Sequence, residues 1–144
     1  MKISQLSIFL ENKEGRLWNA LDALANGGGV NIRALSLADT SDFGILRIIV
    51  HDPEKAKKIL EKNDFIVKII DVVGVELDDT PGGLANVLKL LNENNINLEY
   101  IYAFTHEKTE KAILLLQSKD LDILINVLEN NNVNIVPSKE VYNL

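Results

Sequence analysis

Hydrophobic and polar positions along the chain form one pattern that occurs twice. In the first copy, residues 3–10 alternate as in a strand with one apolar face, and Leu17, Leu21 and Leu24 recur at helical spacing. The pattern predicts the order strand, helix, strand, strand, helix, strand, over residues 3–10, 17–25, 30–38, 45–50, 53–62 and 65–70. Asp52, Pro53 and Glu54 begin the second helix, with Pro53 at its first position.

The second half of the chain repeats this order. Its strands and helices are expected at residues 72–77, 84–91, 96–104, 111–117, 120–128 and 133–136. A strand–helix–strand–strand–helix–strand unit is the ferredoxin-like motif. The sequence therefore predicts an α+β protein of two such units, residues 1–71 and 72–144.

The turn between the first strand and the first helix is also duplicated. Asn12-Lys13-Glu14-Gly15-Arg16-Leu17 in the first copy corresponds to Asp79-Thr80-Pro81-Gly82-Gly83-Leu84 in the second. In the second copy, Thr80 is expected to cap the helix and Pro81 to be its first residue. The free N–H groups of a helix N-terminus favour an anionic group such as a carboxylate.

Composition narrows the class of protein. The chain has 144 residues, a net charge of −6 and no cysteine, which excludes disulfides and thiolate chemistry. Its acidity argues against binding to nucleic acids or to anionic membranes. The first residues lack the apolar core of a signal peptide, and no apolar run approaches the ~20 residues of a membrane span. We therefore expect a cytoplasmic protein.

Nothing in the sequence calls for catalysis. His51 and His106 lie beside polar turns, with no catalytic or metal-ligand spacing around either. The triple glycine at residues 27–29 is not a dinucleotide fingerprint, and no phosphate-binding loop occurs. We expect no enzyme activity, no metal and no cofactor.

The repeated unit and its first loop resemble the ACT domain, a module that senses small molecules, best known for amino-acid control of metabolic enzymes. Asp79, Pro81, Gly82 and Leu84 match the family's Asp-x-Pro-Gly-x-Leu motif in full. The first copy keeps the glycine and the leucine but has asparagine in place of the acid and glutamate in place of the proline. The chain looks like the small stand-alone tandem ACT proteins.

The resemblance implies that the two units lie side by side in one eight-stranded antiparallel sheet with helices on one face. It implies a ligand where the first loop of one unit meets the second strand of the other, with the loop N–H groups holding the carboxylate of an amino acid. The binding residues that it implies are Asn12, Gly15, Arg16, Leu17, Asn31, Ile32, Asp79, Gly82, Gly83, Leu84, Asn97 and Leu98.

Two roles stay open for the polar candidates. Asp79 and Asn12 either accept from an ammonium group or simply start a turn. Asn31 and Asn97 are either polar ligand contacts or turn residues. Two roles are also open for an aromatic row in the second copy, at positions where the first copy has small residues. The row either forms the wall of a ligand pocket or covers the helix-free face of the sheet in a dimer. The row is Tyr100, Tyr102 and Phe104, with Phe9 and Ile49 on the same face of the first copy.

The expected function is that of a sensor that binds a free amino acid or a similar small zwitterion and acts on an unidentified protein target, as a homodimer. The alternative is a structural or interaction module that binds no ligand and dimerises through the helix-free face.

Overall fold

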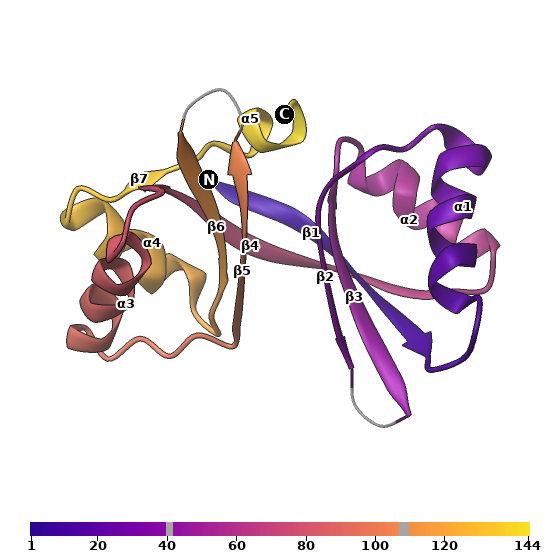
Figure 1. Cartoon of the computed structure of the whole chain (residues 1–144), viewed down its shortest axis with the longest axis horizontal. Helices are drawn as coiled ribbons and strands as arrows, with labels where there is room; N and C mark the ends of the chain where they lie inside the picture. Colours follow the sequence, from indigo (N-terminus) through magenta and orange to yellow (C-terminus); the bar gives the residue numbers. More distant parts are fainter. Residues whose placement is uncertain (40–41, 107–109) are drawn as a thin grey trace. The chain divides into compact units, whose positions relative to one another are not determined.

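The element order of the chain repeats as the sequence predicts (Figure 1). The structure is a computed structural model that describes residues 1–39, 42–106 and 110–144. Its elements are β1 (Lys2–Glu11), α1 (Arg16–Gly28), β2 (Ile32–Asp39), β3 (Phe43–Val50), α2 (Pro53–Lys62), β4 (Ile66–Asp78), α3 (Gly83–Glu93), β5 (Tyr100–His106), β6 (Lys111–Gln117), α4 (Leu121–Asn130), β7 (Asn134–Ile135) and α5 (Ser138–Tyr142). The predicted α+β class of tandem ferredoxin-like units is confirmed.

The strand count differs from the expected eight. Within the described residues the antiparallel sheet has seven strands, because the last strand of the first copy and the first strand of the second form one continuous strand, β4, of 13 residues. β-branched and other apolar residues fill this segment, and no turn residue pair breaks it. The short helix α5 follows the last predicted strand, in a segment for which the sequence pattern predicts no element.

The chain forms two compact units. Residues Ser4–Ile70 with Val141–Leu144 form one, here called the N-terminal unit, and Asp71–Glu140 with Met1–Ile3 form the other, the C-terminal unit. These are units of contact, and the boundaries of the sequence repeat, 1–71 and 72–144, stay a prediction. In the N-terminal unit β3 pairs with both β1 and β2; in the C-terminal unit β6 pairs with both β4 and β5, and β7 pairs with β4.

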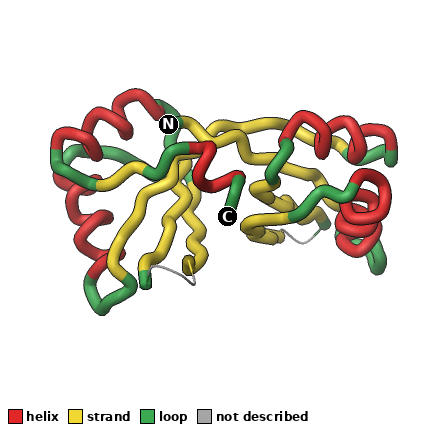
Figure 2. The backbone as a smooth tube through the Cα atoms, turned by 90° about the horizontal axis from the view of Figure 1, so that it is seen from above, coloured by secondary structure: helices red, strands yellow, loops and turns green. Residues whose placement is uncertain are grey.

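Each unit has its own hydrophobic core between two helices and one face of its strands (Figure 2). In the N-terminal unit, Leu24 of α1 and Leu60 of α2 are fully buried against Leu6 of β1. In the C-terminal unit, Leu91 of α3 and Leu128 of α4 take the corresponding places. The alternating strand pattern and the helical stripe were therefore correct guides to both cores.

The helix ends follow their local chemistry. Asp52 and Asp120 cap α2 and α4, each accepting a hydrogen bond from the N–H three residues later, at 3.2 and 3.1 Å. Asn63, Asn94 and Asn131 end α2, α3 and α4, and each amide donates to the carbonyl four residues earlier at 2.8 to 2.9 Å. One asparagine thus ends each of these three helices.

The C-terminal residues are anchored to the N-terminal unit. The N–H of Ser4 donates to the hydroxyl of Tyr142 at 2.6 Å, and Nε of Arg33 donates to the carbonyl of Tyr142 at 3.1 Å. Val141 is fully buried. Ile49, which the sequence offered for a dimer face, is also fully buried within the chain and presents no surface there. No described helix is both long and apolar enough to span a membrane.

Candidate functional site

The loop between β1 and α1 is a tight turn built on a glycine. The N–H of Arg16 donates to the carbonyl of Lys13 at 3.3 Å, and Gly15 has φ 83° and ψ −14°. Positive φ at the third position of such a turn is the mark of type II, where glycine avoids a steric penalty. The N–H of Asn19 then donates to the carbonyl of Gly15 at 2.8 Å and starts the helix.

The loop between β4 and α3 has the same backbone. The N–H of Gly83 donates to the carbonyl of Thr80 at 3.1 Å, Gly82 has φ 90° and ψ −10°, and the N–H of Asn86 donates to Gly82 at 3.0 Å. The helix therefore starts at Gly83 behind a glycine cap. The expectation of a Thr80 cap with Pro81 as the first helical residue is wrong, because Pro81 occupies the second position of the turn, which its fixed φ also suits.

A pocket adjoins each loop within its own unit, and the two are nearly equal in volume. The N-terminal loop pocket has a volume of about 270 Å³ and is lined by Leu10, Glu11, Asn12, Lys13, Leu17, Leu37, Asp39 and Gly44. The C-terminal loop pocket has a volume of about 250 Å³ and is lined by Leu77, Asp78, Asp79, Thr80, Leu84, Ala103, Phe104, Thr105, Ala112 and Leu114.

The two loop pockets are equivalent position by position. The loop residues correspond through the sequence repeat, and the strand residues correspond through register. Gly44 lies opposite both Leu10 and Asp39 in the N-terminal unit. In the same way, Ala112 lies opposite both Leu77 and Thr105 in the C-terminal unit. All eight positions that line the first pocket have counterparts in the second, so the duplication extends from the loop to a pocket.

An ion pair lies at the rim of each pocket, on equivalent acids. Nζ of Lys13 is 2.8 Å from a carboxylate oxygen of Glu11, and Nζ of Lys111 is 2.7 Å from Oδ1 of Asp78. The hydrogen bond and the charge of Lys13 lower the pKa of Glu11, and those of Asp78 raise the pKa of Lys111. The lysine comes from the loop in one unit and from a strand in the other.

The first residue of the helix distinguishes the two loops. Gly83 has no space for a side chain, since a Cβ there would lie 2.5 Å from the carbonyl oxygen of Asp78. Arg16 takes the same place in the N-terminal unit, and its guanidinium lies 4.3 Å from the centre of the Phe65 ring. The Nε of Arg16 is buried without a hydrogen-bond partner among the described residues.

The structure brings together only part of the predicted site. In each unit the acid or amide of the loop, the turn glycine and the first leucine lie together, at Asn12, Gly15 and Leu17 and at Asp79, Gly82 and Leu84. The side chains of Ile32 and Leu98 pack against the hydrophobic cores of their own units instead.

Asn31 and Asn97 lie outside the loop pockets of their own units. Asn31 precedes β2, whereas Asp39 of the pocket ends it, and eight strand residues span about 25 Å. The N–H of Asn31 lies 3.4 Å from Nδ1 of His51, and the carbonyl of Asn97 accepts from Ser118 Oγ at 2.9 Å. A contribution of Asn31 or Asn97 to a ligand held by the other unit stays a prediction.

Sequence reasoning missed the strand residues of both pockets. Leu37, Asp39 and Gly44 line the N-terminal pocket from the far end of the β2–β3 hairpin. The N–H of Asn12 donates to the carbonyl of Asp42 at 3.0 Å, which ties the loop to that hairpin. The strand order of the ferredoxin-like unit, which places the third strand beside the first, was the signal that could have found these residues.

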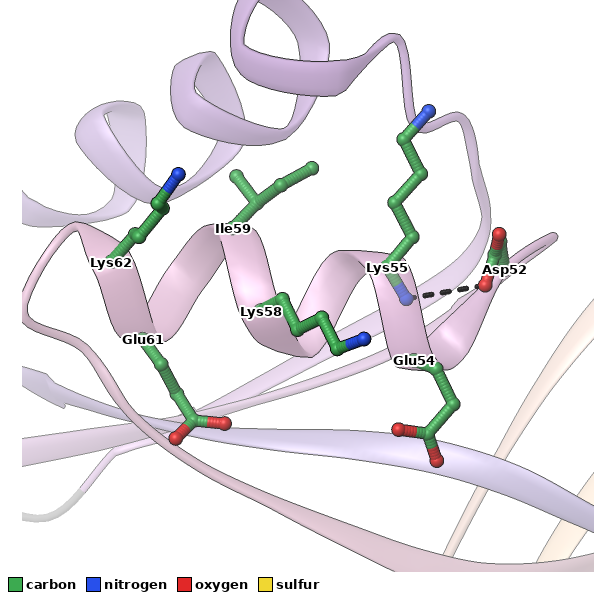
Figure 3. A pocket seen from close by; sticks show the side chains of 7 residues that line it. All are labelled: Asp52, Glu54, Lys55, Lys58, Ile59, Glu61 and Lys62. Atoms are coloured by element: carbon green, nitrogen blue, oxygen red, sulfur yellow. Dashed lines mark hydrogen bonds between the residues drawn. The ribbon is translucent and has the colours of Figure 1, made fainter.

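A larger hollow of about 790 Å³ lies along α2, away from both loops (Figure 3). Figure 3 shows Lys55 and Lys62 projecting from the opposite side of the helix to Glu54 and Glu61. All its walls come from this helix and its cap, and Asp52 is already used in capping. We therefore regard it as a solvated helix surface.

No group of three or more metal-ligating side chains occurs in the part of the chain that the structure describes. The side chain of His106 lies outside that part, so only His51 of the two histidines can be placed, and it is exposed.

The chain belongs to the family of ACT domain pairs, whose model matches residues 1–144. The crystal structure of protein BT0572 from Bacteroides thetaiotaomicron is similar throughout, with 42% identity, a TM-score of 0.92, and coverage of 100% of this chain and 98% of that one. None of the curated proteins matches the sequence.

The fold also occurs in regulatory subunits of aspartate kinase. The ligand-free subunit from Thermus thermophilus is 14% identical with a TM-score of 0.60, over 88% of this chain and 90% of that one. The subunit from Thermus flavus is 16% identical with a TM-score of 0.59, over 89% and 92%. At these identities the likeness concerns the fold alone.

Proposed function

We propose that this protein is a cytoplasmic sensor, without catalytic activity of its own, that binds a free amino acid or a similar small zwitterion. The first loop of a unit holds the carboxylate, and the second strand of the other unit completes the site. The protein acts as a homodimer that passes ligand occupancy to an unidentified protein target.

The duplicated loop pocket is the observation that carries this proposal. A pocket of about 250 Å³ lies below the ~300–1,000 Å³ typical of drug-sized ligands and suits a molecule the size of an amino acid. The pocket adjoins the first turn of a helix, where the N–H groups of Leu84 and Ala85 have no partner within the helix. Donors there attract a carboxylate, and the exposed carboxylate of Asp79 provides an acceptor for an ammonium group.

A thermal-melt screen of the purified protein against the twenty amino acids tests the proposal. A ligand at ~100 times its dissociation constant adds about 2.7 kcal/mol of stability, which raises the melting temperature by ~3–6 °C for a chain of this size. The matched control is the amide of the same amino acid, which lacks the carboxylate and should give no shift. A flat panel, with no amino acid retained through purification, would defeat the proposal.

The interaction module is the second candidate, and one observation favours it. The rings of Phe9 and Phe43 lie 5.6 Å apart on the helix-free face of the N-terminal unit, and each residue is 46% exposed. Exposed aromatic pairs are typical of protein interfaces. Sedimentation of Phe9→Ser beside the unmodified protein separates the candidates: dissociation of a dimer together with a flat amino-acid panel supports the module.

A further inference from the structure

The two loop pockets share a backbone but differ in their ability to hold an ammonium group. Asp79 is exposed and has neither a hydrogen bond nor an ion pair with any described residue, while its neighbour Asp78 is paired with Lys111 at 2.7 Å. One unpaired carboxylate therefore faces solvent at the rim of the C-terminal loop pocket. The equivalent residue in the N-terminal loop is Asn12, a neutral amide.

The residues that line the two pockets also differ in charge, and the C-terminal pocket again suits an amino acid better. Lys13 and Asp39 of the N-terminal pocket correspond to Thr80 and Thr105 of the C-terminal pocket, so two charges are replaced by hydroxyl groups. The C-terminal pocket is further lined by six apolar residues: Leu77, Leu84, Ala103, Phe104, Ala112 and Leu114. Such walls favour an apolar group and penalise a charged one, which would lose its hydration there.

We infer that each chain binds one amino acid, that the C-terminal loop pocket holds it, and that its side chain is aliphatic. This inference rests on the proposed function, to which it adds the number of sites and the class of ligand. Asp79 binds the ammonium group, and the apolar walls take the side chain. The N-terminal pocket keeps the backbone of the site without the loop acid. Its rim charges Glu11 and Lys13 neutralise each other at 2.8 Å. Its remaining carboxylate, Asp39, comes from the end of β2, where the C-terminal pocket has Thr105.

The volume of the pocket agrees with this ligand class. About 250 Å³ accommodates a side chain of three or four carbons, and each buried methylene contributes about 0.8 kcal/mol in transfer from water. Ala103 leaves space beside β5, where the N-terminal pocket has Leu37, while Gly44 in place of Ala112 opens the N-terminal pocket elsewhere and keeps the two volumes nearly equal.

Isothermal titration calorimetry of the full chain with L-leucine, L-valine, L-glutamate and L-lysine tests the inference. We expect one equivalent of L-leucine or L-valine per chain, and at least tenfold weaker binding of L-glutamate and L-lysine. Asp79→Asn removes the charged acceptor and should weaken L-leucine binding about tenfold or more. Glu129→Gln removes one exposed carboxylate of the same unit outside the pocket and serves as the matched control, with affinity unchanged within twofold.

A second variant tests the pocket without changing a charge. Ala103→Leu copies Leu37 of the N-terminal unit onto the exposed edge of β5, and it should fill the space for the side chain and abolish measurable L-leucine binding. Melting without ligand verifies that Asp79→Asn and Ala103→Leu fold.

The possible failures are distinguishable. Two equivalents per chain, full affinity in Asp79→Asn, or tighter binding of L-glutamate or L-lysine would overturn this inference and leave the proposed function standing. No heat and no melting shift with any of the twenty amino acids would overturn the proposed function itself.

Discussion

The two first loops of this protein have nearly the same backbone and different side chains. Gly15 and Gly82 have φ of 83° and 90°, and equivalent N–H groups close both turns. The acid of the C-terminal loop is an amide in the N-terminal one, and Gly83 corresponds to Arg16. A repeat can therefore keep the geometry that two glycines require while the side chains around it diverge.

The difference at the first helical position has a local cause. In the C-terminal unit, α3 approaches the end of β4 so closely that the carbonyl of Asp78 excludes a Cβ at residue 83. In the N-terminal unit, an arginine occupies that position and stacks on Phe65, where the C-terminal unit has Val133 after its second helix. The loop with the full family motif is thus also the one with the more restrictive packing.

We expect the largest loss of stability when the difference between Gly83 and Arg16 is removed. Gly83→Arg copies the N-terminal residue into the C-terminal loop, where the backbone must move to relieve the 2.5 Å approach. Overpacking of this kind costs about 1–3 kcal/mol. Urea denaturation gives the total loss, and hydrogen exchange shows whether it falls on α3 of the C-terminal unit.

The reverse substitution is the control. Arg16→Gly relieves no clash and loses the stacking on Phe65, a partly buried contact worth about 0.5–2 kcal/mol. If Gly83→Arg and Arg16→Gly lowered the free energy of unfolding equally, α3 would not approach its strand more closely than α1 does. That result would contradict the close approach of Gly83 to Asp78.

Much of this comparison could be predicted from the sequence, because it depends on local patterns. The duplicated glycine and leucine located both loops, and the strand alternation located both cores. The capping role given to Thr80 failed for a physical reason. Pro81 and Gly82 suit the middle of a type II turn as well as a helix start, and only the hydrogen bond from Gly83 to Thr80 decides between them.

The strand residues of the pockets depend on long-range register, which local patterns do not contain. Asp39 and Thr105 reach their pockets through the pairing of β2 with β3 and of β5 with β6. Nor does a glycine in a sequence reveal what surrounds it. Gly82 and Gly83 are adjacent, yet the first is required by its φ and the second by a neighbouring carbonyl oxygen.

We expect losses of stability of intermediate and similar size when the equivalent turn glycines, Gly15 and Gly82, are replaced. A Cβ at Gly15 or at Gly82 would meet no atom within 4 Å, so replacement by alanine tests backbone conformation alone. An L-residue in this left-handed region costs about 1–2 kcal/mol. Gly15→Ala and Gly82→Ala should therefore lower the free energy of unfolding by similar amounts in urea denaturation. A neutral result at either position would mean that this turn does not require positive φ.

We expect the smallest effect on stability from the ion pairs at the pocket rims. One pair should be lost at low pH and the other at high pH. Because Lys13 lowers the pKa of Glu11, that pair stabilises the fold above the ordinary pKa of a glutamate, and the contribution is lost as the pH falls through the lowered value. Because Asp78 raises the pKa of Lys111, that pair contributes fully below the ordinary pKa of a lysine and is lost as the pH rises through the raised value.

NMR titration of the Glu11 carboxyl carbon and the Lys111 ammonium nitrogen measures both pKa values directly. Lys13→Ala should raise the pKa of Glu11, and Asp78→Asn should lower that of Lys111, each towards its ordinary value. Both groups are exposed, so added salt should reduce both shifts in the unmodified protein. A pKa of Glu11 that stays low in Lys13→Ala would contradict the assignment of the shift to Lys13.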